Sequence, residues 1–173
     1  MSPLVVASVS LLAVLAMMFA ESRISRRHER RLRDAGAIEP PGDVYATMQW
    51  AYPVAFLAMG VEGAMFGPEP GFTTLVGVLL MCASKALKCW AISSLGPRWT
   101  FRVLVLPGAP LVAHGPYAVV RHPNYIAVVG ELVSMALLVH ARVTGPLATL
   151  LFGLLLRRRI RVENQALRHR TCS

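Results

Sequence analysis

Chemistry in this chain would centre on a polar block, Arg121-His122-Pro123-Asn124-Tyr125, that opens a long apolar run. Proline is favoured in the first turn of a helix, where its missing N–H costs no hydrogen bond, so a helix is predicted to begin at Pro123. The free N–H groups and positive dipole end of such a helix form a seat for an anion such as a carboxylate. Arg121 and His122 would add donors beside it. An ordinary start of a membrane helix with an interfacial arginine explains the same block.

Two tyrosines stand close to this block. Tyr117 follows Gly115-Pro116, a pair typical of a turn, and Tyr125 lies in the first turn of the predicted helix. An aromatic face attracts a cation such as a sulfonium, so both tyrosines are candidates for a binding site. The aromatic belt at a membrane surface is an alternative explanation for both residues.

Charged residues after and within the last apolar runs form a second candidate group. Arg159 and Glu163 are four apart and would share one helix face. Glu163 would accept hydrogen bonds from the hydroxyls of a ligand with Arg159 holding it in place, or the two would form a plain ion pair. Glu131 lies about two turns into the run that starts at Pro123, where an ionisable group is costly and usually functional.

The chain that must position these residues is mostly apolar. Hydrophobic residues make up 55% of its 173 residues and charged residues 16%, and the mean hydropathy is +0.52. A soluble domain of this length would carry more polar surface. The net charge of +9 sits in blocks between apolar runs, which favours membrane topology and lipid headgroups over nucleic acid as its explanation.

The pattern predicts an all-α fold, a polytopic membrane bundle of about five helices in a single domain over residues 1–173. The expected spans are residues 3–20, 47–66, 71–93, 123–139 and 144–156. A basic helical extension is expected after the first span, in the segment 23–34. Between the third and fourth spans, the prolines and glycines of 94–122 exclude a spanning helix, and a basic amphipathic tail, 157–173, follows the fifth.

Lysine and arginine set the predicted orientation. Six lie in the first connection, five in the end of the third run and the long loop, and six in the tail, whereas the other two connections share only Arg142. The positive-inside rule then places the N-terminus outside, and the loop and tail with their candidate pocket in the cytoplasm.

Other residues inside the apolar runs have simpler expected roles. Lys85 and Lys88 are expected to snorkel to the interface, and Glu62 to be exposed near the outer end of its run. Cys82 and Cys89, seven apart, are expected to act as small core hydrophobes. No spacing of cysteine or histidine predicts a metal site.

The polar blocks occur in an order shared with a known group of membrane enzymes. They are Gly115-Pro116-Tyr117 with Arg121-His122-Pro123-x-Tyr125, then Arg159-x-x-x-Glu163. This order resembles the isoprenylcysteine carboxyl methyltransferase family. Three more segments are similar to a bacterial branch of it that is associated with type III polyketide synthases and methylates alkylpyrones or alkylresorcinols. They are Arg27-His28-Glu29-Arg30-Arg31-Leu32-x-x-x-Gly36-Ala37-Ile38-Glu39, Leu95-Gly96-x-x-Trp99-Thr100 and Val105-Leu106-Pro107-Gly108-Ala109.

The resemblance implies a five-helix membrane O-methyltransferase that uses S-adenosylmethionine in a cytoplasmic pocket and admits a lipid-like acceptor from the bilayer. The implied cofactor-binding residues are Gly115, Tyr117, His122, Pro123, Tyr125 and Glu163. Arg159 and Arg121 would lie near the reactive oxygen of the acceptor. One position departs from the family, which usually shows two consecutive glutamates: the second is Asn164 here, which can hydrogen-bond hydroxyls but cannot pair with a cation.

The expected reaction is SN2 transfer of a methyl group to an enol or phenol oxygen of an alkylpyrone, an alkylresorcinol or a related polyketide lipid. A 4-hydroxypyrone is acidic enough to be largely anionic near neutral pH, so orientation and exclusion of water would carry the catalysis. Arg159 would hold the oxyanion, and Glu131 or His122 would serve as base for a resorcinol. The expected partners are a lipophilic substrate, membrane lipid and a type III polyketide synthase as pathway partner, with no nucleic acid, in a bacterial inner or plasma membrane.

Three alternatives stay open. They are isoprenylcysteine carboxyl methylation, an NADPH-dependent membrane reductase, and a non-enzymatic membrane scaffold or transport subunit. A reductase of this kind needs a basic pocket for the 2′-phosphate of NADPH, and the sequence shows no additional basic segment for such a pocket. A transporter places polar residues at mid-membrane, whereas this chain concentrates them in loops.

Overall fold

The computed structural model describes residues 2–169 as a bundle of five α-helices. The elements are α1 (Pro3–Asp34), α2 (Tyr45–Phe66), α3 (Phe72–Leu95), the 3-10 turns η1 (Gly96–Arg98) and η2 (Gly115–Ala118), α4 (Pro123–Leu138) and α5 (Thr144–His169). In that part of the chain there is no β-strand, and a single antiparallel bridge joins Ile38 to Val105. The all-α helical bundle predicted from the sequence is therefore confirmed. The last four residues of the predicted tail, 170–173, lie outside the described residues.

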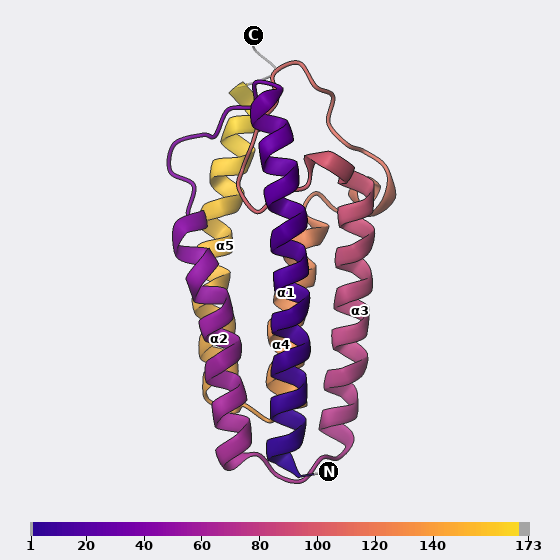
Figure 1. Ribbon diagram of the computed structural model, residues 1–173, viewed down its shortest axis with the longest axis vertical. Helices are drawn as coiled ribbons and strands as arrows, with labels where there is room; N and C mark the ends of the chain where they lie inside the picture. Colours follow the sequence, from indigo (N-terminus) through magenta and orange to yellow (C-terminus); the bar gives the residue numbers. More distant parts are fainter. Residues whose placement is uncertain (1, 170–173) are drawn as a thin grey trace.

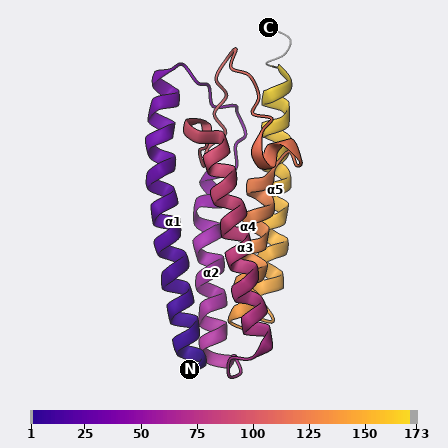
Figure 2. The ribbon, with the colours of Figure 1, turned by 90° about the vertical axis from the view of Figure 1, so that its right-hand side faces the viewer.

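The helices stand side by side, and the connections separate by length to the two ends of the bundle (Figures 1 and 2). The N-terminus and the short turns 67–71 and 139–143 lie at one end. We call the opposite end the polar end; it comprises the last turns of α1, the linker 35–44, the connection 96–122 and the second half of α5. The two segments that carry the candidate chemistry therefore lie at the same end.

Two of the helices run well past their apolar segments. α1 begins at Pro3 behind the Ser2 N-cap, whose Oγ accepts a hydrogen bond from the Val5 N–H at 3.4 Å. It then continues without a break through the arginine-rich segment to Asp34, as the sequence predicts. α5 continues likewise from its apolar half into the basic segment that begins at Arg157. Both helices thus carry charged side chains to the polar end.

Close packing joins α3 to α4. A Cβ atom added at Gly77 of α3 would lie 2.5 Å from the backbone nitrogen of Leu138, so only glycine permits this approach. The core behind this contact is formed by large apolar side chains, among them Phe56, Leu132 and Phe152 of three different helices. The packing fixes α4, which carries part of the candidate site at its first turn.

Large apolar side chains also cover the outside of the bundle. Each helix exposes at least one of them by more than half of its surface: Leu12, Trp50, Leu79, Ile126 and Leu150. A soluble monomer rarely exposes apolar surface on every side, whereas lipid tails solvate it. By length and apolar composition, α1 and the segment Phe72–Arg98 qualify as candidate membrane spans among the described residues. α4 is a shorter apolar helix and α5 turns basic midway, so five helices are confirmed where five spans remain a prediction.

Four charged side chains are buried together inside the bundle. Glu21 comes from α1, Lys85 and Lys88 from α3, and Glu131 from α4; we call them the charge cluster. Lys85 Nζ lies 3.0 Å from a carboxylate oxygen of each glutamate, and Lys88 Nζ lies 2.7 Å from Glu21 Oε2 and 3.2 Å from Glu131 Oε1. Tyr52 of α2 donates a hydrogen bond to Glu131 Oε2 at 2.7 Å. The cluster pairs two basic with two acidic side chains of three helices, and Tyr52 connects it to a fourth.

The charge cluster overturns the expectation that Lys85 and Lys88 snorkel to the membrane surface. Both ammonium groups point inward, and the Lys88 side chain is only 3% exposed. Carboxylates on the neighbouring helices supply nearer counter-charges than headgroups do, so the lysines gain more by pairing inside the bundle.

Two further expectations about the apolar runs are wrong. Glu62 is half-buried, and its carboxylate accepts hydrogen bonds from the N–H groups of Val143 at 2.9 Å and Thr144 at 2.7 Å. It therefore satisfies free donors at the start of α5. Cys82 and Cys89 are exposed, because the buried face of α3 carries glycine, serine, lysine and alanine instead.

Neutralising one acid of the charge cluster should destabilise the fold. Glu131→Gln leaves two buried ammonium groups with one carboxylate, a change that costs roughly 3–5 kcal/mol when a buried pair is broken. We expect a clear fall in the apparent melting temperature of the protein in detergent. The exposed Glu69→Gln serves as control, and Lys88→Met/Glu131→Met, which removes one charge of each sign, should recover most of the loss. A Glu131→Gln variant as stable as the control would contradict this account of the cluster.

Candidate functional site

The phenol oxygen of Tyr125 is the meeting point of the site at the polar end. It donates a hydrogen bond to Glu163 Oε2 at 2.7 Å and accepts one from Arg159 Nε at 2.8 Å. A guanidinium can only donate, so the tyrosine proton must point to the carboxylate. Arg159 and Glu163 therefore meet through Tyr125 and not in the plain ion pair that their spacing also allowed. We call His122, Tyr125, Arg159 and Glu163 the Tyr125 group.

The His122 ring covers Tyr125. The two ring centroids lie 5.4 Å apart with 22° between the planes, and His122 Nδ1 lies 3.8 Å from Glu163 Oε2. Proline at position 123 disfavours the helical conformation for the preceding residue, which accounts for the non-helical backbone of His122 (φ −131°). His122 Nε2 is buried without a hydrogen-bond partner within residues 2–169. Such an atom is a position where a ligand gains a hydrogen bond that the protein does not already make.

The helix start at Pro123 is confirmed, but it offers fewer donors than the sequence suggests. The N–H groups of Tyr125 and Ile126 both donate to the carbonyl of His122, at 3.1 and 3.3 Å. Proline itself has no N–H. The anion-binding site predicted at this helix end therefore has fewer free N–H donors than a helix whose first turn is unpaired.

The η2 turn packs Gly115 against α3 and places Tyr117 where it feels the charge of Glu163. Gly115 has φ +61°, and a Cβ there would lie 2.2 Å from Ser94 Oγ and 3.3 Å from Trp90 Nε1 of α3. Glycine is therefore required both by the backbone conformation and by the close approach. Burial raises the pKa of Tyr117, and the negative charge of Glu163 raises it further. The Tyr117 hydroxyl stays protonated as a donor and lies within the electrostatic reach of Glu163.

Arg159 is fully engaged by the protein. Its side chain is 6% exposed, and besides the bond from Nε to Tyr125, Nη1 donates to Asp43 Oδ1 at 3.2 Å and Nη2 to the Phe101 carbonyl. Every guanidinium nitrogen thus has an acceptor from the chain. Holding the oxygen of an acceptor molecule, the role implied for Arg159 by the sequence, would require one of these bonds to open.

Arg121 and Glu131 are not brought against the Tyr125 group. Arg121 is exposed, and within the described part of the chain it has neither a hydrogen bond nor an ion pair. Glu131 lies in the charge cluster, where Tyr52 and Lys85 contact Oε2 and Lys88 Nζ lies 3.2 Å from Oε1. Their catalytic roles remain predictions, and for Glu131 the contacts favour a structural role.

Sequence reasoning missed three residues that position the site. Asp43 anchors Arg159, while Trp99, 2% exposed, is held by a hydrogen bond between its carbonyl and His28 Nδ1 at 2.8 Å. The Trp99 indole N–H donates to Asn124 Oδ1 at 3.4 Å, which ties the connection to the start of α4. Trp99 and His28 stand in motifs that resemble the family, but a single aspartate in a linker carries no sequence signal of this kind.

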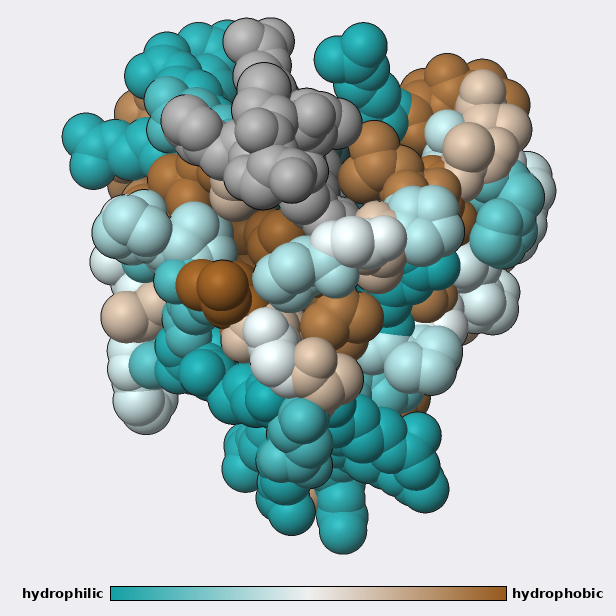
Figure 3. Space-filling view, turned by 90° about the horizontal axis from the view of Figure 1, so that it is seen from above, coloured by the Kyte–Doolittle hydropathy of each residue, from teal (hydrophilic) through white to brown (hydrophobic). Residues whose placement is uncertain are grey.

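The surface of the polar end is strongly basic. Seen from that end, hydrophilic side chains cover much of the face, with hydrophobic residues between them (Figure 3). The exposed arginines include Arg23, Arg26, Arg27, Arg30, Arg31 and Arg33 of α1, Arg98, Arg121, and Arg157, Arg158 and Arg161 of α5. A surface of this charge attracts anionic headgroups and anionic ligands.

Comparisons with known proteins agree with the geometry. The model of the isoprenylcysteine carboxyl methyltransferase (ICMT) family matches residues 76–169. The uncharacterized protein YpbQ of Bacillus subtilis is 33% identical over 148 residues, which are 86% of this chain and 88% of that protein. An uncharacterized protein of Haemophilus influenzae is 26% identical over 163 residues, 94% of this chain and 95% of the other. No solved structure matches the chain.

The family match covers α4, α5 and η2, and thus all four residues of the Tyr125 group together with Gly115 and Tyr117. It spans more than half of the chain, and the similarity to YpbQ extends over most of the rest. The chain therefore belongs to the ICMT family of S-adenosylmethionine-dependent membrane methyltransferases.

Proposed function

We propose that this protein transfers a methyl group from S-adenosylmethionine to an oxygen atom of a lipophilic small molecule, an alkylpyrone, an alkylresorcinol or a related polyketide lipid. The convergence of His122, Tyr125 and Glu163 at one end of an apolar bundle carries the proposal. It joins a polar site for a nucleoside to a surface that lipid-like molecules can reach.

The residues of the site fit the cofactor. Glu163 is a carboxylate suited to ribose hydroxyls, and its contacts with Tyr125 and His122 both use Oε2, which leaves Oε1 to other partners. His122 Nε2 is a buried atom that lacks a partner among residues 2–169. The stacked rings of His122 and Tyr125, with Tyr117 nearby, offer aromatic faces to a cation. When bound, S-adenosylmethionine supplies an electrophilic methyl group on its positively charged sulfur.

The chain contributes orientation and exclusion of water. The side chains of the Tyr125 group are fixed by one another and mostly buried, so they hold their ligand in one geometry at little further entropic cost. A 4-hydroxypyrone is already largely anionic near neutral pH and needs no strong base. For a less acidic phenol, His122 is the base in reach of the site, since Glu131 is occupied in the charge cluster.

The polar end is proposed to face the cytoplasm. Its exposed arginines and the near absence of basic residues from the opposite turns satisfy the positive-inside rule. The apolar flanks of the bundle adjoin this end, so the acceptor would enter from the bilayer. An acceptor of this class makes a type III polyketide synthase the proposed pathway partner.

The acceptor class can be tested with a panel of substrates. Purified protein in lipid nanodiscs is incubated with labelled S-adenosylmethionine and an alkylpyrone, an alkylresorcinol or a prenylcysteine. We expect label in the ether product of the pyrone or resorcinol, with one S-adenosylhomocysteine released per product. Label only in a prenylcysteine ester would replace our acceptor with the carboxyl substrate of the family name, and release of S-adenosylhomocysteine with none of the panel would leave the acceptor assignment wrong.

Cofactor binding should depend on His122 and Glu163. A hydrogen bond to a charged group contributes roughly 1.5–3 kcal/mol, so His122→Ala and Glu163→Gln should each weaken S-adenosylhomocysteine binding by about ten- to hundredfold in calorimetry. Arg158→Ala, an exposed neighbour on α5, is the control and should bind like wild type. Wild-type affinity in both site variants would remove the Tyr125 group from the cofactor site.

A further inference from the structure

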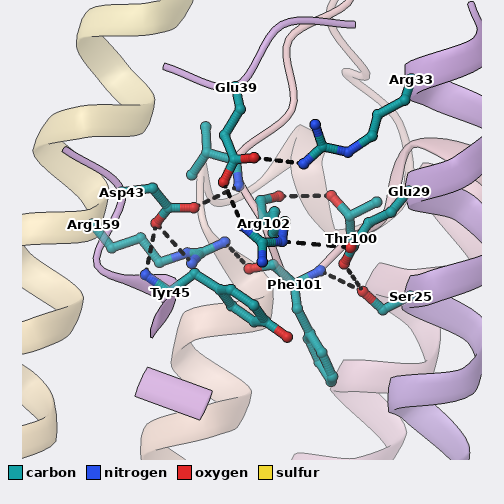
Figure 4. A network of polar contacts seen from close by, with 11 residues as sticks. Ser25, Glu29, Arg33, Glu39, Asp43, Tyr45, Thr100, Phe101, Arg102 and Arg159 are labelled. Atoms are coloured by element: carbon teal, nitrogen blue, oxygen red, sulfur yellow. Dashed lines mark hydrogen bonds and ion pairs between the residues drawn. The ribbon is translucent and has the colours of Figure 1, made fainter. Parts of the chain in front are cut away.

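A buried carboxylate from the linker 35–44, Asp43, lies next to Arg159 of the site (Figure 4). Its side chain is only 4% exposed. Oδ1 accepts hydrogen bonds from Arg159 Nη1 at 3.2 Å and from the Tyr45 N–H at 3.1 Å, and Oδ2 accepts one from the Val103 N–H at 3.0 Å. One carboxylate thus joins the start of α2, the connection after α3 and the guanidinium of α5.

The contacts form a directed chain from Asp43 to Glu163. Asp43 and the Phe101 carbonyl take the two terminal nitrogens of Arg159, which fixes the plane of the guanidinium. Nε then donates to Tyr125 Oη, and Tyr125 donates its own hydrogen bond to Glu163 Oε2. The linker carboxylate is therefore connected to Glu163 through Arg159 and Tyr125.

Asp43 also keeps two opposite charges apart. Arg159 and Glu163 lie four apart on α5, the spacing at which a direct ion pair forms on a helix. A buried guanidinium needs a charged partner, and Asp43 provides one in direct contact. Without that carboxylate, Arg159 would turn to Glu163 and occupy the oxygens that a ligand's hydroxyls require.

We propose that Asp43 is a positioning residue for cofactor binding: it holds Arg159 away from Glu163, so that Glu163 stays available to ligand hydroxyls through its contact with Tyr125. The inference rests on the proposed function, because it assigns a reason for the geometry of that same site. It adds the linker between the first two helices, which precedes the segment that matches the family model, to the cofactor site.

Glu39 of the same linker provides a matched control. It binds Arg102 at 2.8 Å and Arg33 at 2.5 Å, so it also fastens the linker to its surroundings, but it does not contact Arg159 (Figure 4). Burial opposes its ionisation, yet the hydrogen bonds from Arg102 and Arg33 outweigh that and lower the pKa of Glu39. Glu39→Gln therefore loosens the linker while leaving the guanidinium of Arg159 in place.

The first readout needs no ligand. The chain has four tyrosines, so ¹³Cζ-labelled tyrosine gives few NMR signals, and Tyr125→Phe identifies the signal of Tyr125. Asp43→Asn should shift the Tyr125 signal, since Tyr125 loses the hydrogen bond from Arg159. Glu39→Gln should leave it unchanged.

The second readout is the affinity for S-adenosylhomocysteine measured by calorimetry. Asp43→Asn should weaken binding about tenfold, the change that corresponds to about 1.4 kcal/mol, and Glu39→Gln should leave it within about twofold. In an Arg159→Gln background, Asp43→Asn should add no further loss, because its effect passes through Arg159. If the losses of binding free energy in Asp43→Asn and Arg159→Gln add up in the double variant, the proposal is overturned.

The outcomes separate this inference from the proposed function. Wild-type protein that does not bind S-adenosylhomocysteine contradicts the proposed function, whereas the Tyr125 signal still tests the Asp43 chain. Wild-type protein that binds, together with an Asp43→Asn variant that binds equally and shows an unchanged Tyr125 signal, overturns the inference alone. If Asp43→Asn does not fold, Asp43→Glu keeps the charge but displaces it by one methylene, and an unchanged signal and affinity in that variant overturn the inference as well.

Discussion

A buried guanidinium must be surrounded by acceptors, and the arrangement of the polar end follows from how Arg159 obtains them. It takes a carboxylate from the linker, a carbonyl from the connection after α3 and a phenol oxygen from α4. Each of these segments is thereby fixed relative to α5, which carries Glu163. A site for a polar ligand can be precise on this protein only because one buried cation holds together segments that are far apart in the sequence.

The charge cluster joins separate segments in the same way, deeper in the bundle. An apolar bundle in lipid gains little from burying one apolar surface against another, so polar contacts between helices contribute much of its specificity. Two lysines and two glutamates, neutral as a set, join α1 to α3 and α4 with Tyr52 of α2 added. The cluster therefore holds in register, below the site, the helices that support the connection 96–122 and the start of α4.

Local patterns predicted much of this structure. The helix start at Pro123, the breakers of 94–122 and the basic continuation of α1 each depend on residues close in sequence, and all three are confirmed. The convergence of His122 with Glu163 followed from placing loop and tail at one end. The partners of Lys85 and Lys88 and the role of Asp43 could not be predicted, because they depend on how helices pack and rotate against one another. The sequence pattern of the lysines is equally compatible with snorkelling and with buried ion pairs. The positions of the carboxylates on the neighbouring helices decide between the two.

The most direct test of the account asks where the methyl donor touches the chain. Labelled S-adenosylmethionine is crosslinked to the protein by ultraviolet light, and the labelled peptides are identified by mass spectrometry. We expect saturable label in residues 115–125 and 157–166, removed by excess S-adenosylhomocysteine. Saturable label confined to the opposite end of the bundle, at 67–71 or 139–143, would contradict this expectation.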